Sequence, residues 1–147
     1  MKFEYMRELL GLQQYGSFTL TSEKVMMSRN HRLAGKESVL LSELENETLI
    51  TLRDDPYLTE TVLEALNQAG FIPSKTAQTE HTDTVPGKIL QSGGVYITGS
   101  GYSFPGYEDE IIALPISDPE LFFIKSYAWN KENDNPLIRC FLNAVED

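Results

Sequence analysis

The sequence predicts an α/β fold with a largely parallel sheet. Short apolar runs alternate with amphipathic stretches in the order strand, helix, strand, helix, strand, strand, strand, helix. This alternation is typical of strands that are connected through helices and therefore run in the same direction. The chain has 147 residues, of which 41% are apolar and 10% aromatic. That is enough for one compact domain with a buried core and too little for two full ones.

The first third of the chain predicts one helix and several extended stretches. Apolar side chains recur at helical spacing within residues 2–14 and predict a short amphipathic helix. Residues 18–29 predict one or two extended stretches, and residues 30–35 predict a loop. Ser42 is expected to start a single helical turn.

A strand at residues 48–52 followed by a helix is the most firmly predicted part of the fold. The strand is short, apolar and rich in β-branched residues, as a buried strand is. Asp55 fits the N-cap and Pro56 the first helical position, because the carboxylate accepts free amide protons and proline has none to lose. Gly70 fits the left-handed conformation that ends many helices.

The remaining elements are predicted by shorter patterns, with turn residues between them. They are strands at 74–80, 95–98, 111–116 and 121–129, and helices between 81 and 92 and from Asn135 onward.

Charge and cysteine content exclude several classes of protein. The chain carries 12 Lys and Arg against 22 Asp and Glu, a net charge of −10. This charge opposes direct binding to nucleic acid or to an anionic membrane, because both surfaces are themselves negative. Cys140 is the one cysteine, so no internal disulfide can form. With no apolar run long enough to span a membrane and no signal sequence, we expect a cytoplasmic protein.

Residue spacing predicts no metal site, cofactor site or catalytic apparatus. His31, His81 and Cys140 are too far apart in sequence for a local set of metal ligands. Cys140 is expected to be a buried, inert thiol on the apolar side of the last helix. We therefore expect no enzymatic activity and no cofactor.

Two loop patterns have a functional and a structural interpretation. Gly93-Gly94 and Gly99-Ser100-Gly101 resemble pieces of a phosphate-binding loop, but neither is followed by the Lys and Ser/Thr of that motif, which favours simple turns. Tyr102, Phe104 and Tyr107 could form a surface on which a ligand stacks. Packing of these rings against the domain is the favoured interpretation.

Candidate ligand contacts follow from the α/β pattern. In open parallel sheets a ligand lies beyond the carboxyl ends of the strands, near helix N-termini. Residues 51–55, 82–84 and 98–101 occupy such positions. Helix N-termini at Asp55 and near Thr82 would suit a carboxylate or a similar anion.

One stretch, residues 25–35 (VMMSRNHRLAG), resembles the strand and His-Pro-Leu-Ala signature of the effector-binding domain of LysR-type transcriptional regulators. Further motifs follow in the order of that family, up to the end of the chain. They are VLLSEL at 39–44, ETLI at 47–50, LEALNQAGFIP at 63–73, ILQSGGV at 89–95, IALPI with Asp118-Pro119 at 112–119, and NPLIRCFL at 135–142. Three departures stand out: Arg32 replaces the usual proline, the Gly-x-Gly step is shortened to Gly93-Gly94, and Pro86-Gly87 is expected to interrupt the helix before it.

The resemblance implies a periplasmic-binding-protein-like fold of type 2, with two lobes that close on a small effector. On that plan, residues 22–110 form one complete lobe. Residues 1–21, a helix and crossover segment, and residues 111–147, a returning strand and terminal helix, form part of the other lobe. The family's helix-turn-helix and the opening strands of the first lobe have no counterpart in the sequence.

The candidate effector contacts are polar residues that flank the strand ends. They are Thr51, Arg53, Asp54, Thr82, Thr84, Thr98 and Ser100. Arg53 would pair with an anionic effector or, equally, form a surface ion pair with Asp54 or Glu60.

Four functions stay open at this point. The leading one is a small-molecule sensor of a LysR-type regulator that lacks its own DNA-binding module. The others are a binding protein of the same fold with no role at DNA, a dimerisation module, and a small α/β enzyme. No catalytic residues in the sequence support the enzyme. The expected partners are a small, anionic effector and further copies of the chain.

Overall fold

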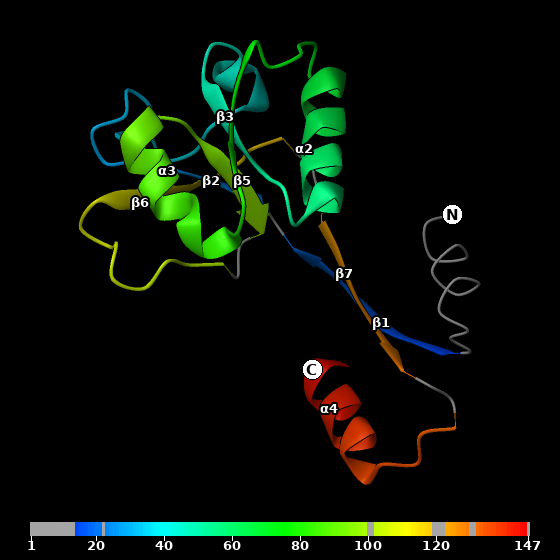
Figure 1. The fold of residues 1–147 in the computed structure, drawn as a ribbon. Coiled ribbons are helices and arrows are strands. Elements are labelled where there is room, and N and C mark those ends of the chain that lie inside the picture. The colour runs from blue at the N-terminus through cyan, green and yellow to red at the C-terminus, as the bar shows by residue number, and fades with distance from the viewer. Residues whose placement is uncertain (1–13, 22, 100–101, 119–122, 130–131, 147) are drawn as a thin grey trace. The chain divides into compact units, whose positions relative to one another are not determined.

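The computed structural model contains two compact units (Figure 1). The larger unit comprises Thr21–Phe123, and the smaller one is formed by Met1–Leu20 and Ile124–Asp147. The helix predicted within residues 2–14 falls in a stretch, up to residue 13, that lies outside the described residues. The structure describes residues 14–21, 23–99, 102–118, 123–129 and 132–146.

The larger unit is built on strands that join in the order β4, β3, β5, β2, β6. Their bounds are Glu23–Ser28 for β2, Thr48–Leu52 for β3, Lys75–Thr79 for β4, Tyr96–Gly99 for β5 and Ile111–Pro115 for β6. β3 pairs with β4 in parallel. The amide of Ile50 donates to the carbonyl of Val95, and that of Val95 to the carbonyl of Thr48, both at 2.9 Å, so the residue before β5 forms a parallel bridge to β3 that links the β3–β4 pair to the other three strands.

β2 runs against the other strands of this sheet. It lies between β5 and β6 and pairs with both in antiparallel register, so that Val25 stands opposite Ile97 on one side and Leu114 on the other. Among the described strands of the larger unit, β2 alone has this direction. The predicted α/β fold is confirmed, with mixed rather than mostly parallel pairing, because both neighbours of β2 are antiparallel to it. The sequence predicted an extended stretch here but not its direction, because side chains alternate in the same way in parallel and antiparallel strands.

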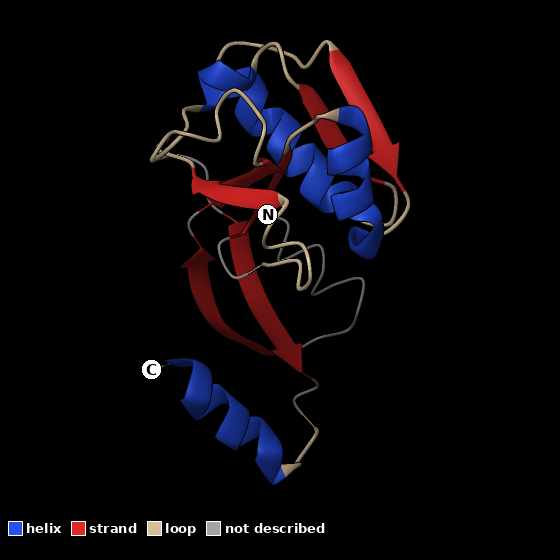
Figure 2. Cartoon of the chain, turned by 90° about the vertical axis from the view of Figure 1, so that its left-hand side faces the viewer, coloured by secondary structure: helices blue, strands red, loops and turns tan. Residues whose placement is uncertain are grey.

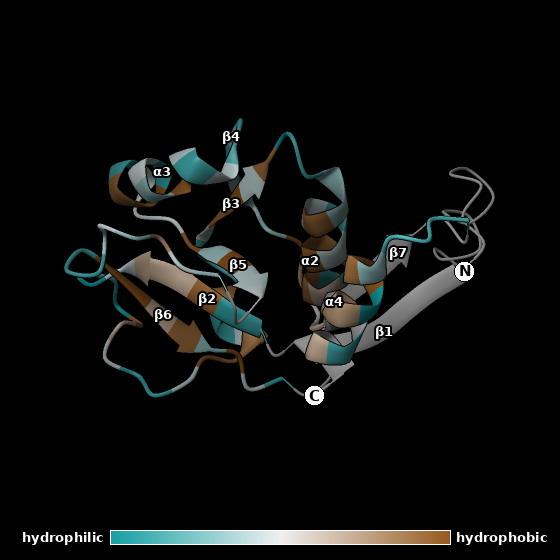
Figure 3. Ribbon diagram, turned by 90° about the horizontal axis from the view of Figure 1, so that it is seen from below, coloured by the Kyte–Doolittle hydropathy of each residue, from teal (hydrophilic) through white to brown (hydrophobic). Residues whose placement is uncertain are grey.

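Two helices cover the two faces of the strands. α2 (Pro56–Gln68) and α3 (Val85–Ser92) lie on opposite sides of the strands (Figure 1), since each packs on its own core cluster. Figure 2 shows the helices in blue and the strands in red. Alternate strand residues pack on each helix, because successive side chains of a strand point to opposite faces. The cluster on the α2 face includes Val62 and Leu66, and the cluster on the α3 face includes Val85. Figure 3 shows the apolar side of α2 and the apolar residues of β6 in brown.

The ends of α2 are those that the sequence predicts. Oδ1 of Asp55 accepts the amide proton of Leu58 at 2.9 Å, and Pro56 occupies the first helical position. Gly70 follows the helix with φ +106°, the left-handed region that a glycine adopts without strain. The local sequence therefore fixes both ends of this helix.

Pro86 does not interrupt a helix, contrary to the expectation from the family pattern. It lies in the first turn of α3, where the missing amide has no intrahelical partner to lose. Gly93 ends the helix with φ +68°, and the amide of Gly93 donates to the carbonyl of Ile89. Both residues therefore define the bounds of α3.

The larger unit extends past the boundary at residue 110 that the sequence predicted. β6 pairs with β2, and the amide of Val39 donates to the carbonyl of Pro115 at 2.9 Å, so this strand belongs to the sheet of the larger unit. The unit ends at Phe123. A short apolar run such as Ile111–Pro115 does not reveal in its sequence which sheet it joins.

The other elements are a second strand pair, a C-terminal helix and two short 3-10 turns. β1 (Gln14–Thr21) pairs with β7 (Phe123–Trp129). α4 (Pro136–Glu146) begins as predicted, and Oδ1 of Asn135 accepts the amide proton of Leu137 at 3.0 Å. Two 3-10 turns are η1 (Leu41–Leu44) and η2 (Thr82–Thr84). Over the described ranges, no helix has the length and apolar character needed to cross a membrane.

Candidate functional site

The strand directions bring several predicted contact residues to one edge of the sheet. β3, β4 and β5 run in the same direction and end at Leu52, Thr79 and Gly99. Because β2 is antiparallel, its start lies beside their ends, with Lys24 opposite Thr98. We call this part of the molecule the carboxyl edge, and it consists of residues 23–24, 51–55, 79–84 and 98–99.

Backbone hydrogen bonds join the turn after β3 to the turn after β4. The amide of Arg53 donates to the carbonyl of Thr79 at 3.0 Å, and the amide of Asp54 donates to that of Glu80 at 3.3 Å. These bonds continue the parallel pairing of β3 and β4 beyond the strands. Two of the three sequence positions predicted for ligand contacts are therefore neighbours in space.

Arg53 forms a surface ion pair, one of its two predicted roles, but with a partner that the sequence did not indicate. Its Nη1 lies 2.8 Å from Oε1 of Glu80, and the two side chains are 65% and 58% exposed. The predicted partners, Asp54 and Glu60, were wrong. They were chosen because they are close to Arg53 in sequence, whereas Glu80 comes close only when β4 pairs with β3. Such an exposed pair contributes about 0–1 kcal/mol, so it holds Arg53 weakly.

Asp54 contacts His81 across the same two turns. Oδ2 of Asp54 lies 2.9 Å from Nδ1 of His81. This hydrogen bond to Asp54 raises the pKa of His81, because the carboxylate stabilises the protonated ring. His81 was expected at the start of a helix and was not among the predicted contacts. Its position directly after a predicted strand was the signal that could have identified it.

Threonine hydroxyls form a short chain at the end of β4. Oγ1 of Thr84 donates to the carbonyl of His81 at 2.6 Å, so the hydroxyl of buried Thr79, also 2.6 Å away, donates to Thr84. Thr84 itself is exposed, and Thr82 is half-buried in η2. The chain of bonds fixes the turn that presents both side chains.

Thr98 is at the carboxyl edge but is closed off from solvent. It is 5% exposed, and its side chain points to the same face of β5 as that of Tyr96, which is also buried. Burial raises the pKa of Tyr96 to about 12. In this structure Thr98 therefore supports the edge from within. Ser100, the last predicted contact, lies outside the described residues.

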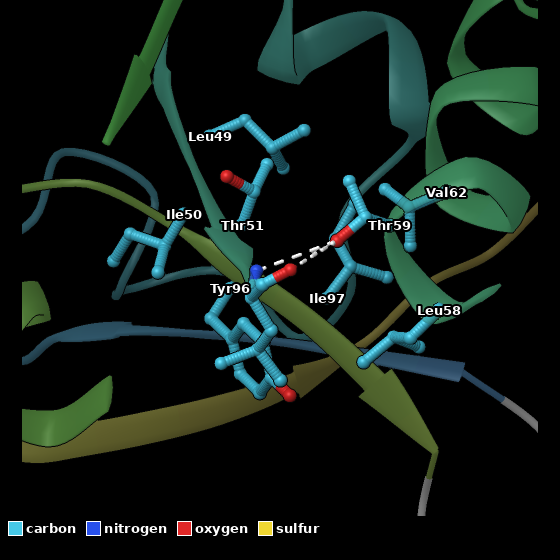
Figure 4. A pocket seen from close by; sticks show the side chains of 9 residues that line it. Leu49, Ile50, Thr51, Leu58, Thr59, Val62, Tyr96 and Ile97 are labelled. Carbon is cyan, nitrogen blue, oxygen red and sulfur yellow. Dashed lines mark hydrogen bonds between the residues drawn. The ribbon is translucent and has the colours of Figure 1, made fainter. Parts of the chain in front are cut away.

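Thr51 faces α2 and lines a small pocket (Figure 4). Leu58, Thr59 and Val62 of α2 form one wall, and the bonded side chain of Thr59 holds the helix to the backbone of Leu52. The space open to the centre of a water molecule is about 10 Å³. That is the room of about one water, so this pocket does not hold an organic effector.

Lys24 is a second cation at the carboxyl edge and was not among the predicted contacts. Its Nζ donates to the carbonyl of Tyr102, the first described residue after β5. Partial burial lowers the pKa of Lys24. The direction of β2 places Lys24 here, and that direction was not predicted.

The aromatic loop mostly follows the favoured interpretation. Phe104 and Tyr107 are partly buried and pack against the α3-side core cluster. Tyr102 is 41% exposed, and its ring meets that of Phe104 edge-to-face with centroids 5.6 Å apart. One ring of this loop thus remains accessible beside the carboxyl edge.

The family model of the LysR substrate binding domain matches residues 21–147 of this chain. The chain belongs to this family. The resemblance found in the sequence motifs is therefore confirmed. The match covers the whole of the larger unit and continues to the last residue.

Similar proteins agree with this LysR substrate-binding domain assignment. The HTH-type transcriptional regulator YwbI of Bacillus subtilis (strain 168) is 24% identical over 120 residues, which are 80% of this chain and 40% of that protein. The chain thus spans about two fifths of the length of this relative.

Two solved structures establish the fold. The effector-binding domain of BenM with its effector benzoate is 15% identical, with a TM-score of 0.73 over 99% of this chain and 72% of that chain. HinK, a LysR family transcriptional regulator from Pseudomonas aeruginosa, is 19% identical, with a TM-score of 0.66 over 86% of this chain and 45% of that chain. The predicted periplasmic-binding-protein-like fold is confirmed by these likenesses.

His31 and Cys140, which were considered as metal ligands, do not form a site in this LysR domain. His31, from the family signature, contacts Glu47, and Arg32, which replaces the family's proline, donates to the same carboxylate at 2.5 Å. Cys140 was expected to be buried, but it is exposed on α4. The prediction was wrong because it relied on the apolar residues next to Cys140 in sequence. Within the part of the chain that the structure describes, no His, Cys, Asp and Glu side chains group as metal ligands would.

Proposed function

We propose that this LysR substrate-binding domain senses a small-molecule effector at its carboxyl edge, as a regulatory domain rather than an enzyme. The observation that carries the proposal is the direct bonding of the turns after β3 and β4, which places Asp54, His81, Thr82 and Thr84 side by side. Polar side chains on bonded, rigid turns at strand ends are what a ligand site in an α/β fold requires.

The predicted contacts divide into two groups on this proposal. Asp54, Thr82 and Thr84, together with His81, would reach the effector, because they are half-buried or exposed. Thr51 and Thr98 would act as supports, because one faces α2 and the other is closed off from solvent. Arg53, which pairs with Glu80, and Ser100 stay predicted contacts outside these two groups.

Sensing requires two states that the effector binds with different affinity. We propose that residues 21–123 form one complete lobe and that the smaller unit is part of the other lobe. Closure of lobes on a ligand is a common form of such a change. We further propose a cytoplasmic homo-oligomer, which sedimentation velocity over a range of protein concentrations tests.

A ligand screen followed by amide mapping tests the proposed function. Small organic acids, amides, amines and sugars are screened for an increase in melting temperature, which should rise with ligand concentration by mass action. For any stabilising compound, amide NMR shifts are expected at residues 53–55, 80–84 and 99. Shifts confined to the opposite edge, around Gly93 and Gly94, or the absence of any stabilising compound contradict the proposal.

A matched pair of variants locates the contact. Thr82→Val removes a hydroxyl at the carboxyl edge, and Thr76→Val removes one from the exposed side of β4. We expect Thr82→Val to weaken binding of the stabilising compound about 10-fold, the value of one lost hydrogen bond, and Thr76→Val to leave it unchanged. Equal effects of the two variants contradict the assignment.

A further inference from the structure

The basic side chains described at the carboxyl edge are bonded to groups of the protein itself. Arg53 pairs with Glu80, and His81 with Asp54. The ammonium group of Lys24 is held by the carbonyl of Tyr102. A carboxylate effector would have to replace these partners before it could bind a positive charge here.

The N-terminus of α2 is also engaged. Its first residue is proline, which offers no amide proton, and the amide of Leu58 donates to the carboxylate of Asp55. A helix N-terminus binds anions through amides of this kind. Asp55 occupies that position with a negative charge of the chain itself.

Fixed charges at the edge are predominantly negative. The acidic residues of the carboxyl edge are Glu23, Asp54, Asp55, Glu80 and Asp83, and its basic residues are Lys24, Arg53 and His81. Bringing like charges together costs free energy, most of all where water is excluded. These charges oppose an anionic effector and favour a cationic one.

An exposed aromatic ring lies beside the end of β5, at the carboxyl edge. The amide of Tyr102 donates to the carbonyl of Gly99, the last residue of β5, at 3.1 Å. The ring is fixed on one side by Phe104, at an interplanar angle of 72°, and remains 41% exposed. The face of an aromatic ring attracts cations.

We infer that the effector presents an uncharged or cationic group, and not a carboxylate, to the carboxyl edge. This inference rests on the proposed function and specifies the class of ligand. It replaces the anionic effector expected from the sequence, because acidic residues outnumber basic ones at this edge and the carboxylate of Asp55 already caps the helix N-terminus.

Compounds that share one skeleton and differ in charge test the inference. Benzoate, benzamide and benzamidine form one series, and butyrate, butyramide and butylamine form a second. Binding to the full chain is measured by calorimetry at constant pH and ionic strength. In each series we expect the amide or the cation to bind at least 10-fold more tightly than the carboxylate.

Two variants with the same change of charge control the experiment. Asp54→Asn removes a charge from the carboxyl edge, and Glu64→Gln removes one from an exposed position further along α2. The preference of the cation over the carboxylate should fall several-fold in Asp54→Asn and stay unchanged in Glu64→Gln. If Asp54→Asn does not fold, the preference in the unmodified chain should still fall between 50 and 500 mM salt, because salt screens fixed charges.

The outcomes separate the inference from the proposed function. Tighter binding of the carboxylates, or a preference for the cation that neither Asp54→Asn nor salt reduces, overturns the inference and leaves the proposed function standing. No binding by any compound of the two series or of the wider screen overturns both.

Discussion

Nε2 of His31 lies 2.9 Å from Oε2 of Glu47, and this contact joins the loop after β2 to the residue before β3. The other ring nitrogen, Nδ1, accepts the amide proton of Leu33, so Nε2 is the nitrogen that donates to the carboxylate. Arg32 donates to the second oxygen of Glu47 and, through Nη2, to the carbonyl of Glu43. One carboxylate thus holds the whole loop, and the arginine makes bonds that the family's proline cannot make.

Replacing Glu47 by alanine should lower the free energy of unfolding by about 1–3 kcal/mol. The His31 and Glu47 side chains are 7% and 13% exposed, so the substitution leaves a nearly buried donor without its acceptor. Urea denaturation followed by circular dichroism measures the effect. Glu45→Ala, at an exposed position of the same segment, is the control, and an equal loss in both variants would contradict the role of the contact.

The same carboxylate predicts how stability depends on pH. Although burial works in the opposite direction, hydrogen bonds from His31 and Arg32 hold the pKa of Glu47 below its ordinary value of 4.5. A carboxyl group with a lower pKa in the folded chain stabilises the fold above pH 4.5, and this contribution is lost as the pH falls through the folded-state pKa. Below pH 4.5, stability should therefore decline less steeply in Glu47→Gln than in the unmodified chain. Identical slopes would show that Glu47 titrates normally.

His81 should titrate above its ordinary pKa of 6.5, with the opposite dependence on pH. Because Asp54 favours the protonated ring, the pair stabilises the fold below pH 6.5 and loses this effect as the pH rises through the raised pKa. The ring protons of His81, assigned with a His81→Gln variant, give the midpoint by NMR. Asp54→Asn should lower that midpoint toward 6.5, and a midpoint that does not respond to this substitution would rule out the pair in solution.

The sequence predicts best what neighbouring residues determine. Asp55, Pro56 and Gly70 define α2 because caps are local, and each of them takes the predicted role. The direction of β2 and the membership of β6 in its sheet depend on pairing between segments far apart in the chain, so they were not predicted.

The candidate site shows the same division. The carboxyl ends of β3, β4 and β5 come together as the α/β pattern predicts, which brings Asp54, Thr82 and Thr84 to one edge. Their bonding partners were not predicted. Glu80, after β4, pairs with Arg53, and the antiparallel β2 brings Lys24 to the edge. The edge therefore has more charged residues than the sequence predicted, and Arg53 already has a partner.

Gly94 should be far less tolerant of alanine than Gly87. A Cβ at Gly94 would lie 2.7 Å from the carbonyl oxygen of Thr48, where β5 joins β3, whereas one at Gly87 has nothing within 4 Å. Gly94→Ala should therefore cost about 1–3 kcal/mol of unfolding free energy, because the strands must separate locally. Gly87→Ala, in α3, should gain about 0.5–1 kcal/mol from its higher helix propensity. Thermal unfolding of the two variants measures both effects, and a stabilising Gly94→Ala would contradict the close approach.

Asp55 combines two properties that substitution can separate. Asp55→Ala removes the oxygen that accepts the Leu58 amide and should cost about 1 kcal/mol of unfolding free energy, the usual value of an N-cap. Asp55→Asn keeps a cap oxygen and removes the charge, so its stability should stay within a few tenths of a kcal/mol of the unmodified chain. Chemical denaturation of the three proteins tests this order. Equal losses in both variants would show that the charge, through the dipole of α2, outweighs the hydrogen bond.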